Sequence, residues 1–191
     1  MLAALIVAVV VGYLLGSIPV AVLVGRARGF DPRHVGDRNP GYWNVKEQLG
    51  PRGSLPVFVG DVAKGAAAGA IGVLLDGHGW GIAYIAVGAA MVGHAYPLFA
   101  GFRGGRSILT FVGGMAVLAP VPAAVTVLVL LVVWAATRSF AWAARVGVFG
   151  FAIVQAAFES KERVAATGAL LSIIGLRFAQ AAIVERRSAA Q

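Results

Sequence analysis

Two short segments of the chain combine a flexible backbone with groups that can bind an anion. Residues 36–44 read Gly-Asp-Arg-Asn-Pro-Gly-Tyr-Trp-Asn, with side-chain amides at Asn39 and Asn44. Residues 104–107 read Gly-Gly-Arg-Ser and directly precede an apolar segment. Glycines let main-chain N–H groups converge on an anion, and Arg106 adds a forked, charged donor. An ordinary turn before a helix is the alternative for the second segment. Together the two segments favour a phosphate-bearing ligand.

Asp61, Lys64 and His94 are ionisable residues that lie within apolar segments. Asp61 and Lys64 are three residues apart, so on a helix they share a face and can pair. Ionisable groups at membrane depth are costly, so we expect the pair to line a protein-enclosed cavity, with snorkelling to the interface as the alternative. His94 is either a structural, hydrogen-bonded histidine or a donor that orients the neighbouring loop. His34 is expected in a solvated loop and His78 in a turn.

The composition predicts a polytopic membrane protein. The 191 residues are 59% hydrophobic and 13% charged, with a mean hydropathy of +0.84, whereas soluble domains carry about 25% charged residues. There is no cysteine and there are only three histidines, so we expect no disulfide, no metal site and no cofactor. The net charge of +8 suits an anionic bilayer surface or a phosphorylated substrate rather than nucleic acid.

The apolar segments predict an all-α bundle of about seven transmembrane helices in a single membrane domain, residues 1–191. The expected spans are residues 2–24, 54–75, 80–100, 108–119, 123–136, 139–158 and 164–184, with the boundary between the fifth and sixth left open. Residues 25–53 are expected to form a long polar loop and residues 120–122 an outer turn. The first segment lacks a basic leader region, so we interpret it as a membrane helix rather than a signal peptide.

The distribution of charge predicts the orientation of this bundle, and small residues predict where its helices pack closely. The basic excess of the long loop places it in the cytoplasm, which predicts an N-out/C-in topology. Fourteen of the sixteen Lys and Arg residues then face the cytoplasm. Gly12, Gly16 and Ser17 fall at helical spacing and predict close packing against a neighbouring helix. Pro19 is expected to kink the first helix.

Five motifs within residues 10–140 resemble the bacterial PlsY family in order and spacing. They are Gly-Ser-Ile-Pro at 16–19, Gly-x-x-Asn-Pro-Gly-x-x-Asn-Val at 36–45 with Leu-Gly at 49–50, Asp-x-x-Lys-Gly at 61–65, Gly-His-x-x-Pro-x-Phe at 93–99 and Phe-x-Gly-Gly-x-x-x-x-Thr at 102–110. The resemblance implies a seven-helix enzyme of the bacterial inner membrane with cytoplasmic active-site loops. Such enzymes transfer a fatty acyl group from acyl phosphate to glycerol 3-phosphate and make lysophosphatidic acid.

The motifs and the resemblance together nominate the site residues. We expect catalytic roles for Asn39, Arg106, His94 and Asp37, and substrate binding by Gly36, Gly41, Asn44, Lys64, Gly104, Gly105 and Ser107. The expected partners are acyl phosphate, glycerol 3-phosphate or a related acceptor, and membrane lipids.

The chain departs from the family pattern at several of these places. In the first loop, Asp37 stands at a serine position, Arg38 at a glycine position, Tyr42 and Trp43 at an Ala-Thr pair, and Glu47 at an arginine position. In the second loop, Ser107 stands at a glycine position. Further along the chain, residues 138–142 replace a serine-rich stretch, and Phe178 and Ala181 stand where a His and an Asn are expected. A carboxylate beside a phosphate is repulsive unless Arg38, Lys46 or Arg106 compensates. We therefore expect the donor-phosphate cradle to persist and acceptor recognition to be altered.

Two other functions stay open at this point. A non-catalytic relative could bind lipid or a partner protein, and the absent His and Asn near the C-terminus favour that interpretation. A small membrane transporter is motivated only by Asp61 and Lys64 within a span. Turnover of acyl phosphate would separate an acyltransferase from both.

Overall fold

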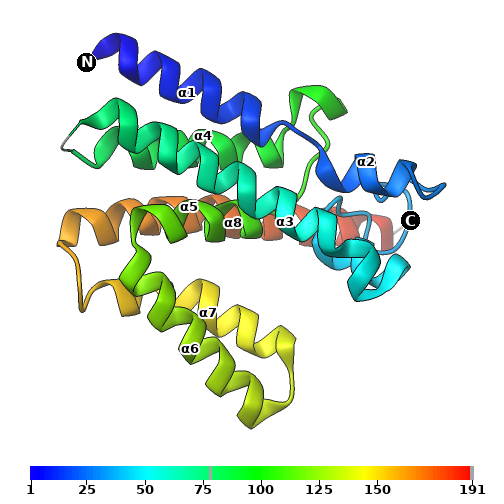
Figure 1. Ribbon diagram of the computed structural model, residues 1–191. Helices are drawn as coiled ribbons and strands as arrows, with labels where there is room; N and C mark the ends of the chain where they lie inside the picture. The colour runs from blue at the N-terminus through cyan, green and yellow to red at the C-terminus, as the bar shows by residue number, and fades with distance from the viewer. Residues whose placement is uncertain (78, 190–191) are drawn as a thin grey trace.

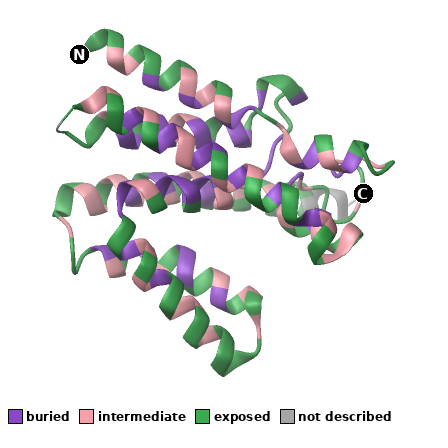
Figure 2. Ribbon diagram, in the orientation of Figure 1, coloured by how far each residue is buried: buried purple, intermediate pink, exposed green. Residues whose placement is uncertain are grey.

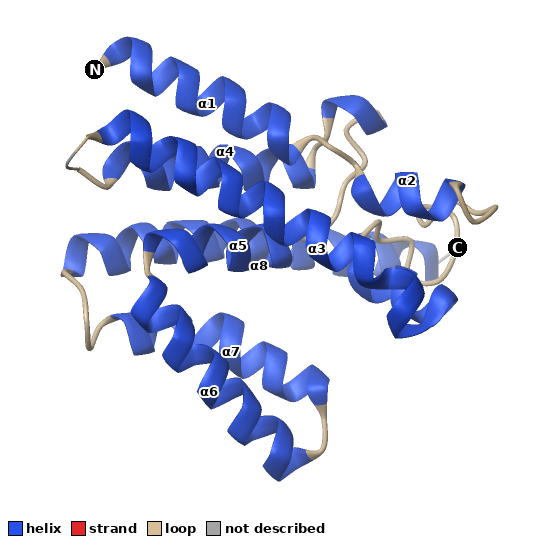
Figure 3. Cartoon of the chain, viewed as in Figure 1, coloured by secondary structure: helices blue, strands red, loops and turns tan. Residues whose placement is uncertain are grey.

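The computed structural model describes residues 1–77 and 79–189 and is built entirely of helices over those residues (Figures 1 and 3). His78, expected in a turn, lies outside them. The elements are α1 (Leu2–Gly16), α2 (Val20–Arg26), α3 (Tyr42–Asp76), α4 (Gly81–Ala95), the 3-10 helix η1 (Leu98–Ala100), α5 (Ile108–Leu118), α6 (Pro120–Thr137), α7 (Phe140–Gln155) and α8 (Lys161–Ala189). Among the described residues, five segments are long and apolar enough to cross a membrane, and α5 and α7 are shorter apolar helices. The all-α membrane fold is confirmed, while the count of seven crossings and their orientation stay predictions.

The first membrane segment is broken at Pro19, as expected. Helix α1 ends at Gly16 and α2 begins at Val20, because proline has no N–H to donate to the preceding turn. At the break, the Ile18 carbonyl accepts the N–H of Val20 across 3.0 Å. Lys64 of α3 donates to the same carbonyl across 3.1 Å, which adds a contact between α3 and the break.

The predicted polar loop over residues 25–53 is wrong in its second half. Helix α3 already begins at Tyr42, and Gly50, with a φ of 71°, then breaks the helical path before Pro51. Residues 42–49 are helical because Val45 is fully buried and packs with Val57 and Ala21 of α2. This long-range packing is invisible to local polarity, which is why the sequence-based boundary at residue 54 was too late.

Small residues let the central helices approach closely. The α1 residues Gly12 and Gly16 face α4, where an added Cβ would meet the carbonyl oxygens of Ala86 and Ala90. Gly65 of α3 stands against the Thr110 carbonyl of α5 in the same way. Such contacts are typical of membrane helix interfaces, where packing rather than water exclusion drives association. The predicted close packing of Gly12 and Gly16 is confirmed, and Ser17 is fully buried beside them.

Helices α6 and α7 form a hairpin that leans away from the other helices (Figure 1). Only 6% of the α6 segment is buried, and its exposed residues are apolar (Figure 2). The outer turn predicted at residues 120–122 is wrong: α6 begins at Pro120, directly after Ala119. Proline is favoured in the first turn of a helix because the N–H it lacks has no helical partner there.

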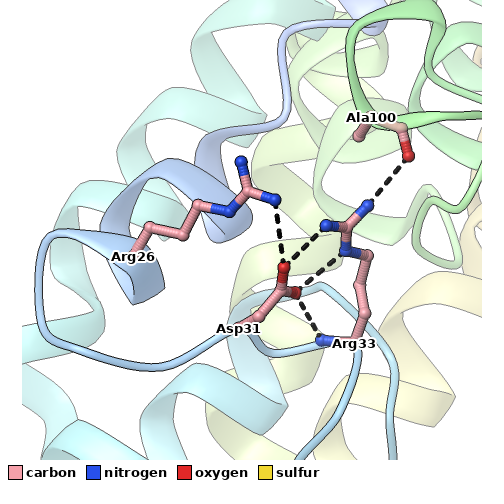
Figure 4. A network of polar contacts seen from close by, with 4 residues as sticks. All are labelled: Arg26, Asp31, Arg33 and Ala100. Atoms are coloured by element: carbon pink, nitrogen blue, oxygen red, sulfur yellow. Dashed lines mark hydrogen bonds and ion pairs between the residues drawn. The ribbon is translucent and has the colours of Figure 1, made fainter.

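An ionic network ties the polar loop to the end of the 3-10 helix η1 (Figure 4). Arg33 donates to both carboxylate oxygens of Asp31, at 2.9 and 2.6 Å, and to the Ala100 carbonyl at 2.9 Å. Arg26 adds a longer contact of 3.4 Å to Asp31. The hydrogen bonds from Arg33 hold the pKa of Asp31 well below its usual range, and Asp31 in turn raises the pKa of Arg33. Charge-assisted bonds therefore fix the loop, in addition to the packing of Phe30 on the apolar cluster of Ala21, Val45 and Val57.

The close approach of α3 and α5 predicts a strong effect of a side chain at Gly65. We expect Gly65→Val to destabilise the protein by at least about 1–3 kcal/mol, because the added atoms overlap a backbone carbonyl that cannot move aside. The measurement is thermal unfolding of the purified protein in detergent. Gly168→Ala is the matched control, since a Cβ there meets nothing within 4 Å; equal losses for both variants would contradict the packing argument.

The Asp31–Arg33 network predicts a pH-dependent contribution to stability. We expect Asp31→Asn to cost about 2 kcal/mol at pH 7, where the carboxylate accepts charged hydrogen bonds. Because the folded-state pKa lies below the ordinary value of 3.8, this contribution is complete above that value and declines as the pH falls through the lowered pKa. Unfolding curves of the wild type and Asp31→Asn should therefore converge on acidification below about pH 4. Glu47→Gln, at an exposed position, should show little difference at either pH; parallel curves for Asp31→Asn would contradict the assignment.

Candidate active site

The first glycine-containing loop is built around the buried side chain of Asn44. Its Nδ2 donates to the carbonyl oxygens of Pro32, Val35 and Asn39, at 2.8, 3.0 and 3.1 Å. Gly36 has a φ of 57°, and a Cβ at this position would overlap the Asn44 Oδ1. Asn44, expected to bind substrate, thus faces loop carbonyls in this structure, and Gly36 is required by both its conformation and the lack of space.

The second loop lies against His94 at the end of α4. The N–H of Gly105 donates to the His94 carbonyl across 3.1 Å. Side-chain atoms on Gly104 or Gly105 would overlap the carbonyl or the imidazole of His94. Ser107 has a φ of 61° and its hydroxyl, buried, donates to the Met91 carbonyl across 2.7 Å. The hydroxyl of Ser107 is therefore occupied by the protein, although substrate binding was expected of it.

Beneath this loop, three ionisable side chains form one buried cluster. The Asp61 carboxylate lies 2.8 Å from the Lys64 ammonium and 3.5 Å from the His94 Nδ1. Their side chains are 2%, 4% and 7% exposed, so the predicted pairing of Asp61 and Lys64 is confirmed and the snorkelling alternative is wrong. A charge buried at this depth needs a partner for each of its polar atoms.

A cleft of about 590 Å³ opens between the two loops and the C-terminal part of α8. Its size is that of a small-molecule site. The lining residues are Gly36, Asp37, Arg38, Asn39, Gly104, Arg106, Arg177, Gln180, Ala181 and Val184. Three of these are arginines, which suits an anionic ligand.

Arg106 bridges the two loops and reaches α8. Its Nη1 lies 3.3 Å from the Asp37 carboxylate, which also accepts the N–H of Asn39 at 3.1 Å. The guanidinium lies over the Phe178 ring, 4.7 Å from its centre. Asp37 thus neutralises part of the charge that Arg106 brings to the cleft.

The structure divides the expected site residues into two groups. Those that line the cleft are Gly36, Asp37, Asn39, Gly104 and Arg106. Those that lie outside its lining are Gly41, Asn44, Lys64, His94, Gly105 and Ser107. Arg177 and Gln180 line the cleft but were not expected there; a basic residue close to the end of the last span was the one signal that pointed to Arg177.

Comparisons with known proteins agree on the family. The family model described as glycerol-3-phosphate acyltransferase matches residues 6–187. A glycerol-3-phosphate acyltransferase of Rubrobacter xylanophilus is 42% identical over 112 residues, which cover 59% of this chain and 56% of the relative. One of Bordetella pertussis is 36% identical over 154 residues, which cover 80% of this chain and 71% of the relative. The aligned part thus spans only about half the length of several relatives.

Solved structures agree with the sequence comparison. The crystal structure of PlsY (YgiH), an integral membrane glycerol 3-phosphate acyltransferase, in its glycerol 3-phosphate form, has a TM-score of 0.82 and 26% identity, covering 97% of this chain and 92% of that chain. Its lysophosphatidic acid form has a TM-score of 0.80. The resemblance inferred from the motifs is confirmed: this multi-pass membrane protein belongs to the glycerol-3-phosphate acyltransferase family, PlsY.

Proposed function

We propose that the protein transfers a fatty acyl group from acyl phosphate to glycerol 3-phosphate, or a closely related acceptor, and so forms lysophosphatidic acid. The observation that carries the proposal is the arginine-lined cleft between two glycine-containing loops, in a chain whose fold matches PlsY over 97% of its length. Both substrates carry a phosphate, and arginine is the side chain best suited to bind one. The transporter alternative has less support, because Asp61 and Lys64 are buried and paired with protein groups.

The proposed chemistry is positioning with electrostatic stabilisation. The acceptor hydroxyl oxygen attacks the acyl carbonyl carbon, the bond from that carbon to the phosphate oxygen breaks, and the hydroxyl proton leaves with the phosphate or by way of Asp37. Arg106 is placed to stabilise the departing phosphate. None of the described residues accepts a hydrogen bond from the N–H groups of Arg106, Ser107 or Ile108, so these donors at the start of α5 can add to an anion cradle.

Asp37 is the residue that we expect to change acceptor recognition. Its carboxylate already occupies Arg106 at 3.3 Å, so an incoming phosphate must displace a negative charge from that guanidinium. Glu47, the second replacement by a carboxylate, does not line the cleft. We therefore expect any altered recognition of the acceptor to depend on Asp37. The second candidate function is binding without turnover, because Phe178 and Ala181 stand where the family resemblance implies a His and an Asn.

The proposed function also implies a cellular location for the protein. We place the single membrane domain in a bacterial inner membrane with both glycine loops in the cytoplasm. The basic excess of the polar loop supports this sidedness. A soluble glycerol phosphate and a membrane-embedded acyl chain can then meet at the interface.

Arg106 is the first residue to test. In detergent or liposomes, the wild type is expected to release phosphate from acyl phosphate and to form lysophosphatidic acid when glycerol 3-phosphate is present. Arg106→Ala should lower kcat by about 10²–10³-fold, because one preorganised donor to the developing charge is lost, whereas Arg106→Lys keeps the charge and should retain more activity. Arg28→Ala, at an exposed position of the same polar region, is the control. Absence of turnover together with thermal stabilisation by acyl phosphate would instead support the binding function.

The role of Asp37 in acceptor recognition is tested by replacing it with serine, the residue that the family resemblance implies at this position. Asp37→Ser should lower the KM for glycerol 3-phosphate by about tenfold, because removing the carboxylate frees Arg106 and removes like-charge repulsion. The measurement is initial rate against acceptor concentration at constant ionic strength. Glu47→Gln serves as the control, since that carboxylate lies outside the cleft lining. A fall in kcat with no change in KM would contradict this role and assign Asp37 to proton transfer.

A further inference from the structure

Arg177 of α8 holds the second glycine loop by its backbone. Its Nη2 donates to the Gly104 carbonyl at 2.9 Å and its Nε to the Gly105 carbonyl at 3.1 Å. The partners lie more than seventy positions earlier in the chain, so these bonds are a tertiary contact between the last helix and the loop. A forked guanidinium can bridge two successive carbonyls, which a single ammonium cannot do in the same way.

The peptide unit between Gly104 and Gly105 is held from both sides. Its carbonyl accepts from Arg177, and its N–H, on Gly105, donates to the His94 carbonyl. A trans peptide points its N–H and C=O in opposite directions, so Arg177 and His94 together fix the plane of this peptide. The loop cannot rotate there without breaking a bond on one side.

The guanidinium of Arg177 is itself locked in place. It lies 4.8 Å from the centre of the Tyr96 ring. Its Nη1 donates to the Gln180 Oε1 at 2.8 Å, and the Tyr96 hydroxyl donates to the same oxygen at 2.9 Å. The Tyr13 hydroxyl donates to the Tyr96 carbonyl at 2.9 Å, which connects the arrangement to α1. The guanidinium is held by the Tyr96 ring and by three acceptors, the carbonyls of Gly104 and Gly105 and the Gln180 Oε1. Because the guanidinium is planar and rigid, little side-chain entropy is lost for each of these hydrogen bonds.

Phe178, the next residue of α8, contacts the side chain of Arg106. Phe178 places its ring under the Arg106 guanidinium, while Arg177 holds the carbonyl of the peptide that precedes Arg106. Since the N–H of that peptide belongs to Arg106, it points away from Arg177. The end of α8 therefore sets the direction of both the backbone and the side chain of Arg106.

We propose that Arg177 is a positioning residue, which fixes the second loop so that Arg106 and its N–H meet the phosphate of acyl phosphate. This inference rests on the proposed acyl transfer. Arg177 acts through Gly104 and Gly105, and a loss of about 1 Å in placement can lower a rate by about 10²-fold.

The test compares Arg177→Lys and Arg177→Ala with Arg186→Lys and Arg186→Ala, because Arg186 is an exposed arginine of the same helix. Arg177→Lys is expected to keep the thermal midpoint and to lose about 10²-fold in kcat/KM for acyl phosphate. Hydrogen exchange of the Gly105 amide, which donates to the His94 carbonyl, should become at least tenfold faster. Guanidinium chloride at millimolar concentration should restore activity to Arg177→Ala at least tenfold, whereas sodium chloride at equal ionic strength should not. The Arg186 variants should match the wild type in each measurement.

The outcomes separate this inference from the proposed function. A wild type that makes no lysophosphatidic acid overturns the acyl-transfer proposal, while the exchange measurement still reports on whether Arg177 holds the loop. An active wild type whose Arg177→Lys variant keeps both full kcat/KM and slow exchange overturns the positioning role. If Arg177→Ala does not fold, the lysine variant alone decides, because its activity and exchange are compared at an unchanged thermal midpoint.

Discussion

The buried cluster of Asp61, Lys64 and His94 is the contact on which the site depends. Lys64 donates to the Ile18 carbonyl at the break beside Pro19, and Asp61 balances the charge of Lys64. The same carboxylate lies beside His94, whose carbonyl holds Gly105. Because lipid offers no alternative partners for these groups, loss of Asp61 or Lys64 leaves a buried charge unpaired. Ionisable residues within the bundle thus support the loops from below.

The cleft above this cluster is assembled from parts that are remote in the chain. One wall is the loop organised by Asn44, the second is the glycine pair that packs on His94, and the third is the end of α8. Each wall is held by hydrogen bonds to backbone carbonyls more than by apolar contact.

Two contacts hold Arg106 at this cleft. Asp37 and Phe178 both contact Arg106, the first as an ion pair and the second through its ring. The arginine is thereby held between the first loop and α8 before any ligand arrives. Cation–π contact orients a guanidinium without removing its charge, whereas the carboxylate competes directly with a phosphate. The two contacts therefore act in opposite directions on anion binding.

The sequence by itself determined the membrane class, the break at Pro19, the pairing of Asp61 with Lys64 and the two glycine loops. These follow from local spacing, because periodicity and proline chemistry act within one or two helical turns. Only the tertiary structure decided that residues 42–49 are helical, that Ser107 is occupied by Met91, and that Arg177 holds Gly104 and Gly105. The Arg177 contact joins residues 72 positions apart, and no local pattern encodes how two distant helices pack. The glycine loops predicted an anion site, and only the packing of α8 shows that Arg177 lines the same cleft as Arg106.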